Sequence, residues 1–354
     1  MKTKQWFMAI ATLAIAGCSQ NEILEKKADA DKSIGFNVYT GVQTRGTETT
    51  NTTIEASGVG FGVMALMPKS GSSDYDVYMT SRHVTKDNSN NWTYTPTAYW
   101  PVGGESLSFY SYAPYSDTYD GTTNNGGGIK TKPSTTELFS STTPSIEFTI
   151  KGDWTKMVDL VAAKNETVSP TDNAISVAFS HVLTRIGFKA KTSADIGSGT
   201  TVKVTKLEIL GSTSLSGSCF YEKGKYNIKD ASWSDPTALS GDYTITMANG
   251  GVGLSSTAVN LLGDNNYLFC IPVSSLSENA IKVKITYTIT SNNVASEKTQ
   301  IASIPQGHFV KGTAYSYLFT ITLNGITFTL GTMGSWTATD PADTGLTPTD
   351  IPTT

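Results

Sequence analysis

The side chains that most often perform catalysis are few in this chain, and they do not stand at the spacings that catalytic or metal sites require. The histidines are His83, His181 and His308, and no HExxH, paired-cysteine zinc spacing, Walker-type glycine loop or GxSxG elbow occurs. His181 continues the apolar alternation of residues 175–179, so we expect it to be a hydrogen-bonded core histidine. The sequence therefore predicts a protein that is not an enzyme and that binds no metal and no cofactor.

One cysteine near the start of the chain does stand in a recognisable chemical context. Two lysines open the chain, about 11 apolar residues follow, and the small pair Ala16–Gly17 comes immediately before Cys18. This order is typical of a secretion signal, and the apolar run is too short for a bilayer, which takes about 20 apolar residues. The stretch IAGC resembles the bacterial lipobox, in which cleavage before the cysteine leaves its thiol to be acylated. We expect a lipoprotein signal peptide over 1–17 and lipid on Cys18; the alternative is an ordinary signal with an incidental cysteine.

Composition limits the partners of the exported chain. The 354 residues are enough for two domains of ordinary size. Without the two lysines of the signal, 24 basic residues face 30 acidic ones, which leaves a net charge of −6. Phosphate binding needs a basic face, so nucleic acid is not an expected partner.

Apolar and polar residues alternate with a period of two along most of the chain. In 281–290, IKVKITYTIT, the apolar side chains take one face and Lys and Thr the other, as in a half-buried antiparallel strand. Clusters of Gly, Asn, Ser and Asp separate such runs, and no long window has a helical period. The sequence therefore predicts an all-β fold of the sandwich type. Further strands are expected at 34–38, 59–67, 146–150, 175–179, 186–190 and 315–323.

Two features predict how these strands are organised. In 201–210, TVKVTKLEIL, the apolar phase switches after Val204, and one extra residue near Lys206 would restore the buried face, so we expect a β-bulge. The polar stretch 162–174 interrupts the strands near the middle of the chain, and we place a domain boundary there. The predicted layout has an N-terminal sandwich over 46–170, a C-terminal sandwich over 171–338 and a flexible tail over 339–354.

Two cysteines remain after the signal, Cys219 and Cys270. An exported protein can form a disulfide between them. Both cysteines lie in strand-like segments, so buried free thiols are at least as well supported as a bridge.

The run YWPVGGESLSFYSYAPYSDTY is rich in aromatic residues. Leu107 and Phe109 share one strand face, which leaves Tyr110 and Tyr112 on the other face, beside Tyr115. Exposed flat aromatics can stack on the apolar face of a pyranose, so these tyrosines are a candidate ligand platform. The alternative is that they decorate the outside of a sheet or pack under a loop.

Four motifs together resemble the fimbrillin family, the Mfa-like and major-fimbria-like pilins of Gram-negative anaerobes. They are YWPVGGESLSFYSYAPY, DLVAAKNETV, VAFSHVLTRIGFKAK and KGTAYSYLFTITLNGITFTLGTMGSW, and with the lipobox they extend from Cys18 to about Trp336. The resemblance implies two tandem transthyretin-like β-sandwich domains that build or cap a type V pilus. It also implies export as an outer-membrane lipoprotein, removal of the lipidated segment and first strand by an arginine-specific protease, and filling of the resulting groove by a strand of a neighbouring subunit.

Particular residues of this sequence match what that scheme requires. Arg45-Gly46 follows the first expected strand and would be the cut, which makes 18–45 a propeptide of tether and strand; read alone, Arg45 is a surface arginine in a linker. The strand removed would carry Ile34, Phe36 and Val38 into the core, and its loss would leave open strand edges. The candidate donor strand has the same spacing in Ile326, Phe328 and Leu330.

We therefore expect a structural subunit of a surface pilus that supports adhesion. Its expected partners are copies of itself or sibling pilins, the arginine-specific protease, the outer membrane through lipid on Cys18, and a host glycan or protein. The alternative is a tethered glycan-binding or adhesin lipoprotein at the anchor or tip, which would use the tyrosine cluster.

Overall fold

A computed structural model describes residues 32–40, 49–115, 128–130, 139, 142–150, 152–263 and 266–335. Strands make up most of these ranges, so the all-β prediction is confirmed. The helices in the described ranges are short: α2 (Asn51–Glu55), η1 (Trp154–Lys156) and η2 (Ala248–Gly250). None of them is long and apolar enough to cross a membrane.

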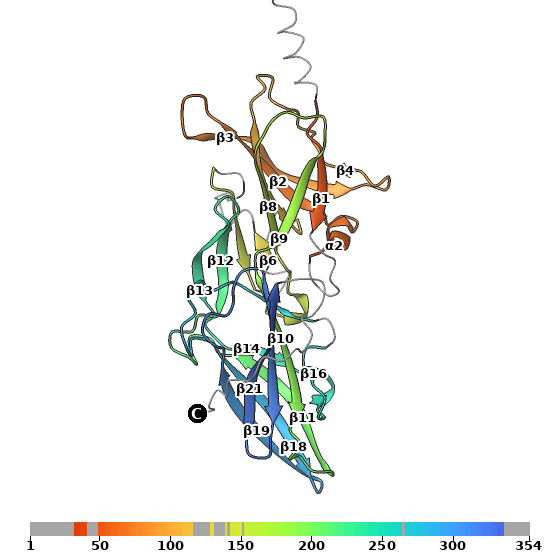
Figure 1. Cartoon of the computed structure of the whole chain (residues 1–354), viewed down its shortest axis with the longest axis vertical. Helices are drawn as coiled ribbons and strands as arrows, with labels where there is room; N and C mark the ends of the chain where they lie inside the picture. The colour runs from red at the N-terminus through yellow and green to blue at the C-terminus, as the bar shows by residue number, and fades with distance from the viewer. Residues whose placement is uncertain are drawn as a thin grey trace, which may run out of the picture.

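A seven-stranded sheet occupies the upper half of the molecule (Figure 1). In spatial order its strands are β1 (Phe36–Thr40), β9 (Ile175–His181), β8 (Val161–Val168), β5 (Leu107–Ala113), β2 (Phe61–Pro68), β3 (Tyr75–Lys86) and β4 (Trp92–Thr93). Every pairing in it is antiparallel except that of β1 with β9, which is parallel. Among the described strands β1 pairs with β9 and with no other, so it is an edge strand of this sheet, and the residues just before it bond to 98–100.

A four-stranded sheet lies below, and its strands come from distant parts of the chain. Its order is β13 (Ser232–Ala238), β12 (Tyr221–Asn227), β7 (Ser145–Thr149) and β6 (Gly128–Lys130). The pairing of β7 with β12 joins a strand from the first half of the chain to one from the second.

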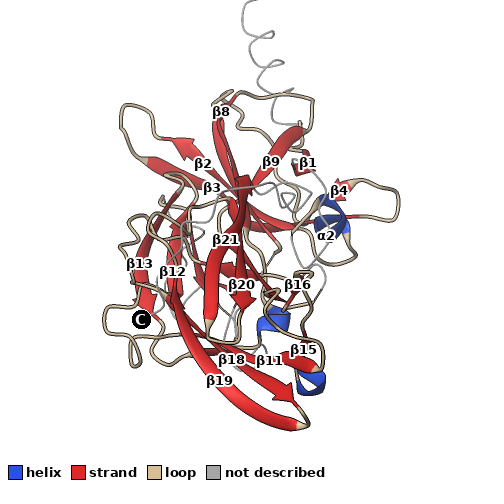
Figure 2. Cartoon of the chain, turned by 60° about the horizontal axis from the view of Figure 1, so that its bottom comes forward, coloured by secondary structure: helices blue, strands red, loops and turns tan. Residues whose placement is uncertain are grey.

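Two five-stranded sheets form the lower half of the molecule. The first contains β16 (Val259–Asn260), β10 (Thr184–Thr192), β20 (Thr313–Ile321) and β21 (Ile326–Ser335), with β17 (Leu268–Cys270) also on β10. The second contains β14 (Tyr243–Thr246), β11 (Thr200–Ile209), β18 (Lys282–Ser291) and β19 (Val294–Ser303), with β15 (Val252–Gly253) also on β11. Figure 2 shows β18 and β19 as a long curved hairpin at the opposite end of the molecule from β1. Apolar side chains of both sheets, such as Phe188, Tyr317, Val204 and Ile285, share one core, as in a sandwich.

The expected bulge in β11 is confirmed. The register of β11 against β18 shifts between Val204 and Lys206, so Thr205 is the extra residue. As a result Val202, Val204, Leu207 and Ile209 are all buried on the same core.

The polar stretch 162–174 does not separate two sheets. It includes most of β8 and the connection to β9, and the two strands pair with each other through Val161–His181 and Ala162–Ser180. The predicted boundary assigns β9 to the C-terminal sandwich, whereas β9 pairs with β1 and β8 in the seven-stranded sheet. The polar residues there therefore mark a hairpin connection.

Candidate functional site at the first strand

The first strand, β1, is held along one edge of the seven-stranded sheet. It runs parallel to β9 in a five-residue register from Phe36–Ile175 to Thr40–Phe179. Just before it, the backbone N–H of Ile34 donates to the carbonyl of Ala98 (2.9 Å), and the Tyr94 hydroxyl donates to the Ile34 carbonyl (2.7 Å). These bonds fix which side chains of the strand face inward.

The inward side chains of the first strand complete the core of this sheet. Ile34 is 2% exposed and Phe36 is 4% exposed, whereas Val38 is half-buried and packs against the same core. The prediction that this face points into the core is therefore confirmed. The Phe36 ring meets Phe61 and Phe109 edge-on, with centroids 6.0 and 5.7 Å away. Without β1, the rings of Phe61 and Phe109 would lose their contact with Phe36, and the backbone groups on one edge of β9 would lose their hydrogen-bond partners.

Both ends of the segment that follows β1 lie at the same end of β9. Thr40 stands opposite Phe179. Where the description resumes, the Thr49 N–H donates to Oδ2 of Asp159 (2.9 Å) and the Thr49 hydroxyl donates to the Asp159 carbonyl (2.7 Å). Asp159 is fully buried, and the same Oδ2 lies 2.8 Å from Nδ1 of His181, the last residue of β9. The predicted cut, Arg45-Gly46, falls between Thr40 and Thr49, outside the described residues. The predicted lipid site, Cys18, also lies outside the described residues.

The candidate donor strand lies within β21, paired antiparallel along its length with β20. Ile326 is 6% exposed and Phe328 is 1% exposed. The Phe328 ring stacks on Tyr317 at 5.5 Å and packs at a tilt against Phe319 at 4.8 Å. The side chain of Leu330 is outside the description. In this structure the strand is therefore part of its own chain's sandwich.

Comparison with known proteins shows what kind of chain carries this arrangement. A family model described as fimbrillin-like matches residues 44–336. The chain belongs to the fimbrillin-like family. The fimbrium subunit Fim1C of Phocaeicola vulgatus is 32% identical to this fimbrillin, over 97% of this chain and 99% of that protein. The crystal structure of a fimbrial protein from Bacteroides vulgatus has a TM-score of 0.70 and 26% identity, and the match covers 87% of this chain and 100% of that one.

The predicted tyrosine platform of this fimbrillin is not exposed. Tyr110 and Tyr112 do lie on the face of β5 opposite Leu107 and Phe109, but they are 1% and 0% exposed. That face packs on the core that includes Phe139 and strands β6 and β7, so both faces of β5 are covered. The prediction of a sugar-stacking surface at these two residues is therefore wrong. Tyr115 is half-buried and stacks on His83, with ring centroids 3.8 Å apart.

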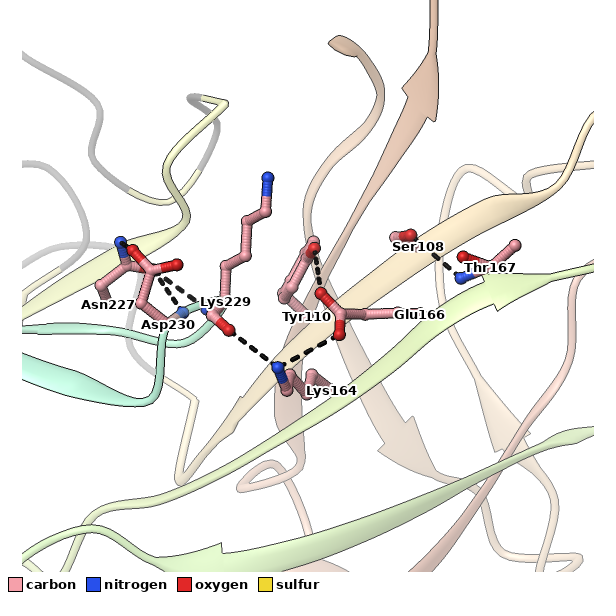
Figure 3. Close-up of polar contacts among 8 residues, drawn as sticks. All are labelled: Ser108, Tyr110, Lys164, Glu166, Thr167, Asn227, Lys229 and Asp230. Carbon is pink, nitrogen blue, oxygen red and sulfur yellow. Dashed lines mark hydrogen bonds and ion pairs between the residues drawn. The ribbon is translucent and has the colours of Figure 1, made fainter. Parts of the chain in front are cut away.

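Tyr110 instead belongs to a polar contact between the seven-stranded sheet and the turn after β12 (Figure 3). Its hydroxyl donates to Oε1 of Glu166 (3.1 Å), and Lys164 Nζ bridges Oε2 of Glu166 (3.1 Å) and the carbonyl of Lys229 (2.9 Å). Burial, followed by the nearby Glu166 carboxylate, raises the pKa of Tyr110. The residue therefore stays neutral and serves as a donor at this junction.

Cys219 and Cys270 are free thiols, so they form no disulfide with each other. Cys270 is buried within β17, and burial raises the pKa of its thiol. Cys219 is half-buried.

Sequence reasoning anticipated the hydrogen bond of His181 but missed its partner, Asp159. The signal was present: Asp159 is a single carboxylate within the apolar run MVDLV, 157–161. A lone acid in such a run must be paired if it is buried. Across the described part of the fimbrillin, no group of three or more His, Cys, Asp or Glu residues could hold a metal ion.

Proposed function

We propose that this protein is a structural subunit of a surface fimbrium, which is exported as a lipoprotein and polymerised by strand exchange after cleavage at Arg45. Membership of the fimbrillin-like family and the likeness to the fimbrium subunit Fim1C support the role of structural subunit. The fimbrial protein of similar structure supports it as well.

The observation that carries the exchange step is the position of β1. Among the described strands β1 pairs with β9, the residues just before it bond to 98–100, and Ile34 and Phe36 fill the adjoining core. A cut after Arg45 would separate β1 from the rest of the chain, and its departure would open a slot beside β9. Burying each such side chain contributes about 1.5–3 kcal/mol, so an empty slot favours a new strand with the same alternation.

The anchor at Thr49 supports a cut that leaves the remaining chain in place. Thr49 is bound to the buried Asp159 through two hydrogen bonds. Severing the chain before this residue would free β1 without loosening α2 and β2, which follow it.

The strand that fills the slot in a neighbouring subunit is, in this proposal, the segment with Ile326, Phe328 and Leu330. Its spacing repeats that of Ile34, Phe36 and Val38. Because β21 is paired with β20 in the described chain, donation requires that this hairpin open first. Exposure of the slot and opening of the hairpin are thus two separate steps.

Lipid on Cys18 would hold the precursor at the outer membrane until the cut, after which the subunit would join the pilus on the cell surface. The partners are then copies of itself or sibling pilins, together with the arginine-specific protease. Adhesion to a host glycan or protein would be a property of the assembled fibre. Catalysis has no part in this role.

The test is cleavage of the purified precursor with an arginine-specific protease, followed by intact mass, denaturing gels and electron microscopy. The expected result is release of the segment ending at Arg45 and fibres or SDS-resistant ladders from the remainder. Arg45→Gln should block both, while Arg82→Gln, a half-buried arginine in β3, should block neither. A precursor that is cut at Arg45 and stays monomeric would refute strand exchange by this chain.

A further inference from the structure

A groove of about 610 Å³ opens beside β13, in a part of the molecule that the proposed exchange does not use. Its walls are the start of β13 with the turn before it, the loop 271–276 and the loop 306–311. Exposed apolar surface comes from Trp233, Pro236, Pro272 and Val310, and the buried side chains of Leu276 and Phe309 lie behind it. The volume lies in the range of ligand-binding clefts, and its aromatic lining suits an extended chain with apolar side chains.

The polar part of this groove is neutral except for one cation. Serines and Gln306 supply hydroxyl and amide groups, and Lys311 is the one charged residue that lines it in the described chain. Its Nζ donates to the Ala231 carbonyl (2.5 Å) and lies 5.5 Å from the centre of the Tyr226 ring. Partial burial lowers the pKa of Lys311, and a carboxylate beside it would oppose this shift. The groove is therefore suited to an acidic occupant.

The backbone around the groove is held in an unusual conformation at three places. Phe309 has φ of 67° although its side chain is bulky and 1% exposed, and Ala231 and Asp235 have φ of 51° and 50°. Non-glycine residues rarely adopt positive φ, and such residues gather at ligand sites, where the surrounding structure maintains them. A hydrogen bond from Val273 N–H to the Phe309 carbonyl (3.0 Å) joins two walls of the groove across this residue.

The described chain ends next to this groove. Ser335, the last residue of β21, stands opposite Thr313 in β20. Thr313 comes two residues after Lys311. Because the two strands are antiparallel, the chain travels along β21 toward the loop 306–311 as it leaves the sheet.

The residues after Ser335 have the composition that the groove favours. The segment 336–354, WTATDPADTGLTPTDIPTT, contains three aspartates, three prolines, Leu346 and Ile351, and it has neither lysine nor arginine. Proline-rich segments favour an extended conformation of about 3.1 Å per residue and dock in aromatic-lined grooves. The five residues from Ser335 to Asp340 would thus reach about 15 Å, which brings the first aspartate within range of Lys311.

We propose that the groove between β13 and the loops 271–276 and 306–311 binds residues 336–354 of the same chain, with Lys311 paired to an aspartate of that segment. The bound segment covers Trp233 and Val310 and secures the end of β21 against its own sandwich. This inference does not depend on strand exchange, since it concerns the folded single chain.

The first test uses the full chain and an endoprotease that cleaves before aspartate, with the C-terminal fragments followed by mass spectrometry. Docking should slow cleavage at Asp340, and Lys311→Glu should raise that rate at least tenfold. Lys298→Glu, an exposed lysine of β19 far from the groove, should leave it unchanged. Equal rates in the wild type and in Lys311→Glu would overturn the proposal, as would a rate that falls with protein concentration, because the segment would then be held by a second copy.

A second test measures binding of the segment directly, and its main comparison does not require Lys311→Glu, which could disturb the loop itself. A chain ending at Ser335 should bind a fluorescent peptide of residues 336–354, and the full chain should bind it at least tenfold more weakly because its groove is occupied. In the truncated chain, Lys311→Glu should lower the affinity for this peptide at least tenfold. The same variant should bind more tightly to a peptide whose three aspartates are replaced by lysine. Equal binding of the peptide by the truncated and full chains would overturn the proposal.

Discussion

The substitution Phe36→Ala tests whether β1 is the removable part of the N-terminal core. The ring is 4% exposed and is surrounded by Phe61, Tyr94 and Phe109, with centroid distances of 5.7 to 6.0 Å. Phe-to-Ala changes in a packed core cost about 3–5 kcal/mol, part of it from lost edge-on ring contacts. With a denaturant slope of about 2–3 kcal/mol/M, the urea midpoint of the uncut precursor should fall by about 1–2.5 M.

The same change should have no effect once the strand has gone. After cleavage at Arg45 and removal of the released segment, Phe36→Ala and the wild type are the same molecule and should unfold at the same midpoint. Between cutting and release, the severed strand should leave at least about a hundredfold faster in Phe36→Ala, at about 1.4 kcal/mol per tenfold. Release is followed by size-exclusion chromatography with mass detection. The matched control is Asn37→Ala, whose side chain points outward from the same strand. If Phe36→Ala lowers the free energy of unfolding of the uncut precursor by less than about 1 kcal/mol, or if Asn37→Ala lowers it equally, the argument from packing is refuted.

Three further measurements follow from the described contacts. Asp159→Asn should lower the free energy of unfolding by about 1.5–3 kcal/mol, because it removes the charge from a fully buried acceptor of a backbone N–H; an unchanged urea midpoint would contradict this. Burial raises the pKa of Tyr226 to about 12, so the unfolded chain loses this proton at a lower pH than the folded chain does. The free energy of unfolding should therefore fall as the pH rises from 10 toward 12, by about 1.4 kcal/mol at pH 11. Tyr226→Phe should lack this part of the loss of stability at alkaline pH. In a Cys18→Ser chain, a thiol reagent should label Cys219 without denaturant and Cys270 only on unfolding, and rapid native labelling of both would contradict the buried position of Cys270.

Local patterns predicted the strands well because alternation reports which side of a strand is buried. The inward face of Ile34 and Phe36 and the alternation of β9 are both confirmed. The switch of phase in β11 predicted a bulge near Lys206, and the extra residue is Thr205; a slip of one residue moves every following side chain to the other face.

Local patterns could not tell how many faces of a strand are covered. In β5 the alternation places Leu107 and Phe109 on one face and Tyr110 and Tyr112 on the other, and the tyrosine face could equally be exposed, yet every residue of β5 is buried. The cover comes from strands β6 and β7 and from Phe139, whose position depends on the distant pairing of β7 with β12. Likewise, the polar stretch 162–174 reads equally well as a linker or as a hairpin turn. Such questions are decided by contacts between segments far apart in the chain.

The parallel pairing of β1 with β9 has a consequence for the order of folding. A parallel pair cannot be joined by a tight turn, and here Phe36 meets Ile175, 139 residues further along the chain. A chain made from its amino end delivers β1 early and β9, its strand partner in the described residues, late. Until β9 emerges, the apolar side of β1 has no sheet to join, and pairing at such sequence separation is slow. The strand that is made first thus pairs into the sheet among the last.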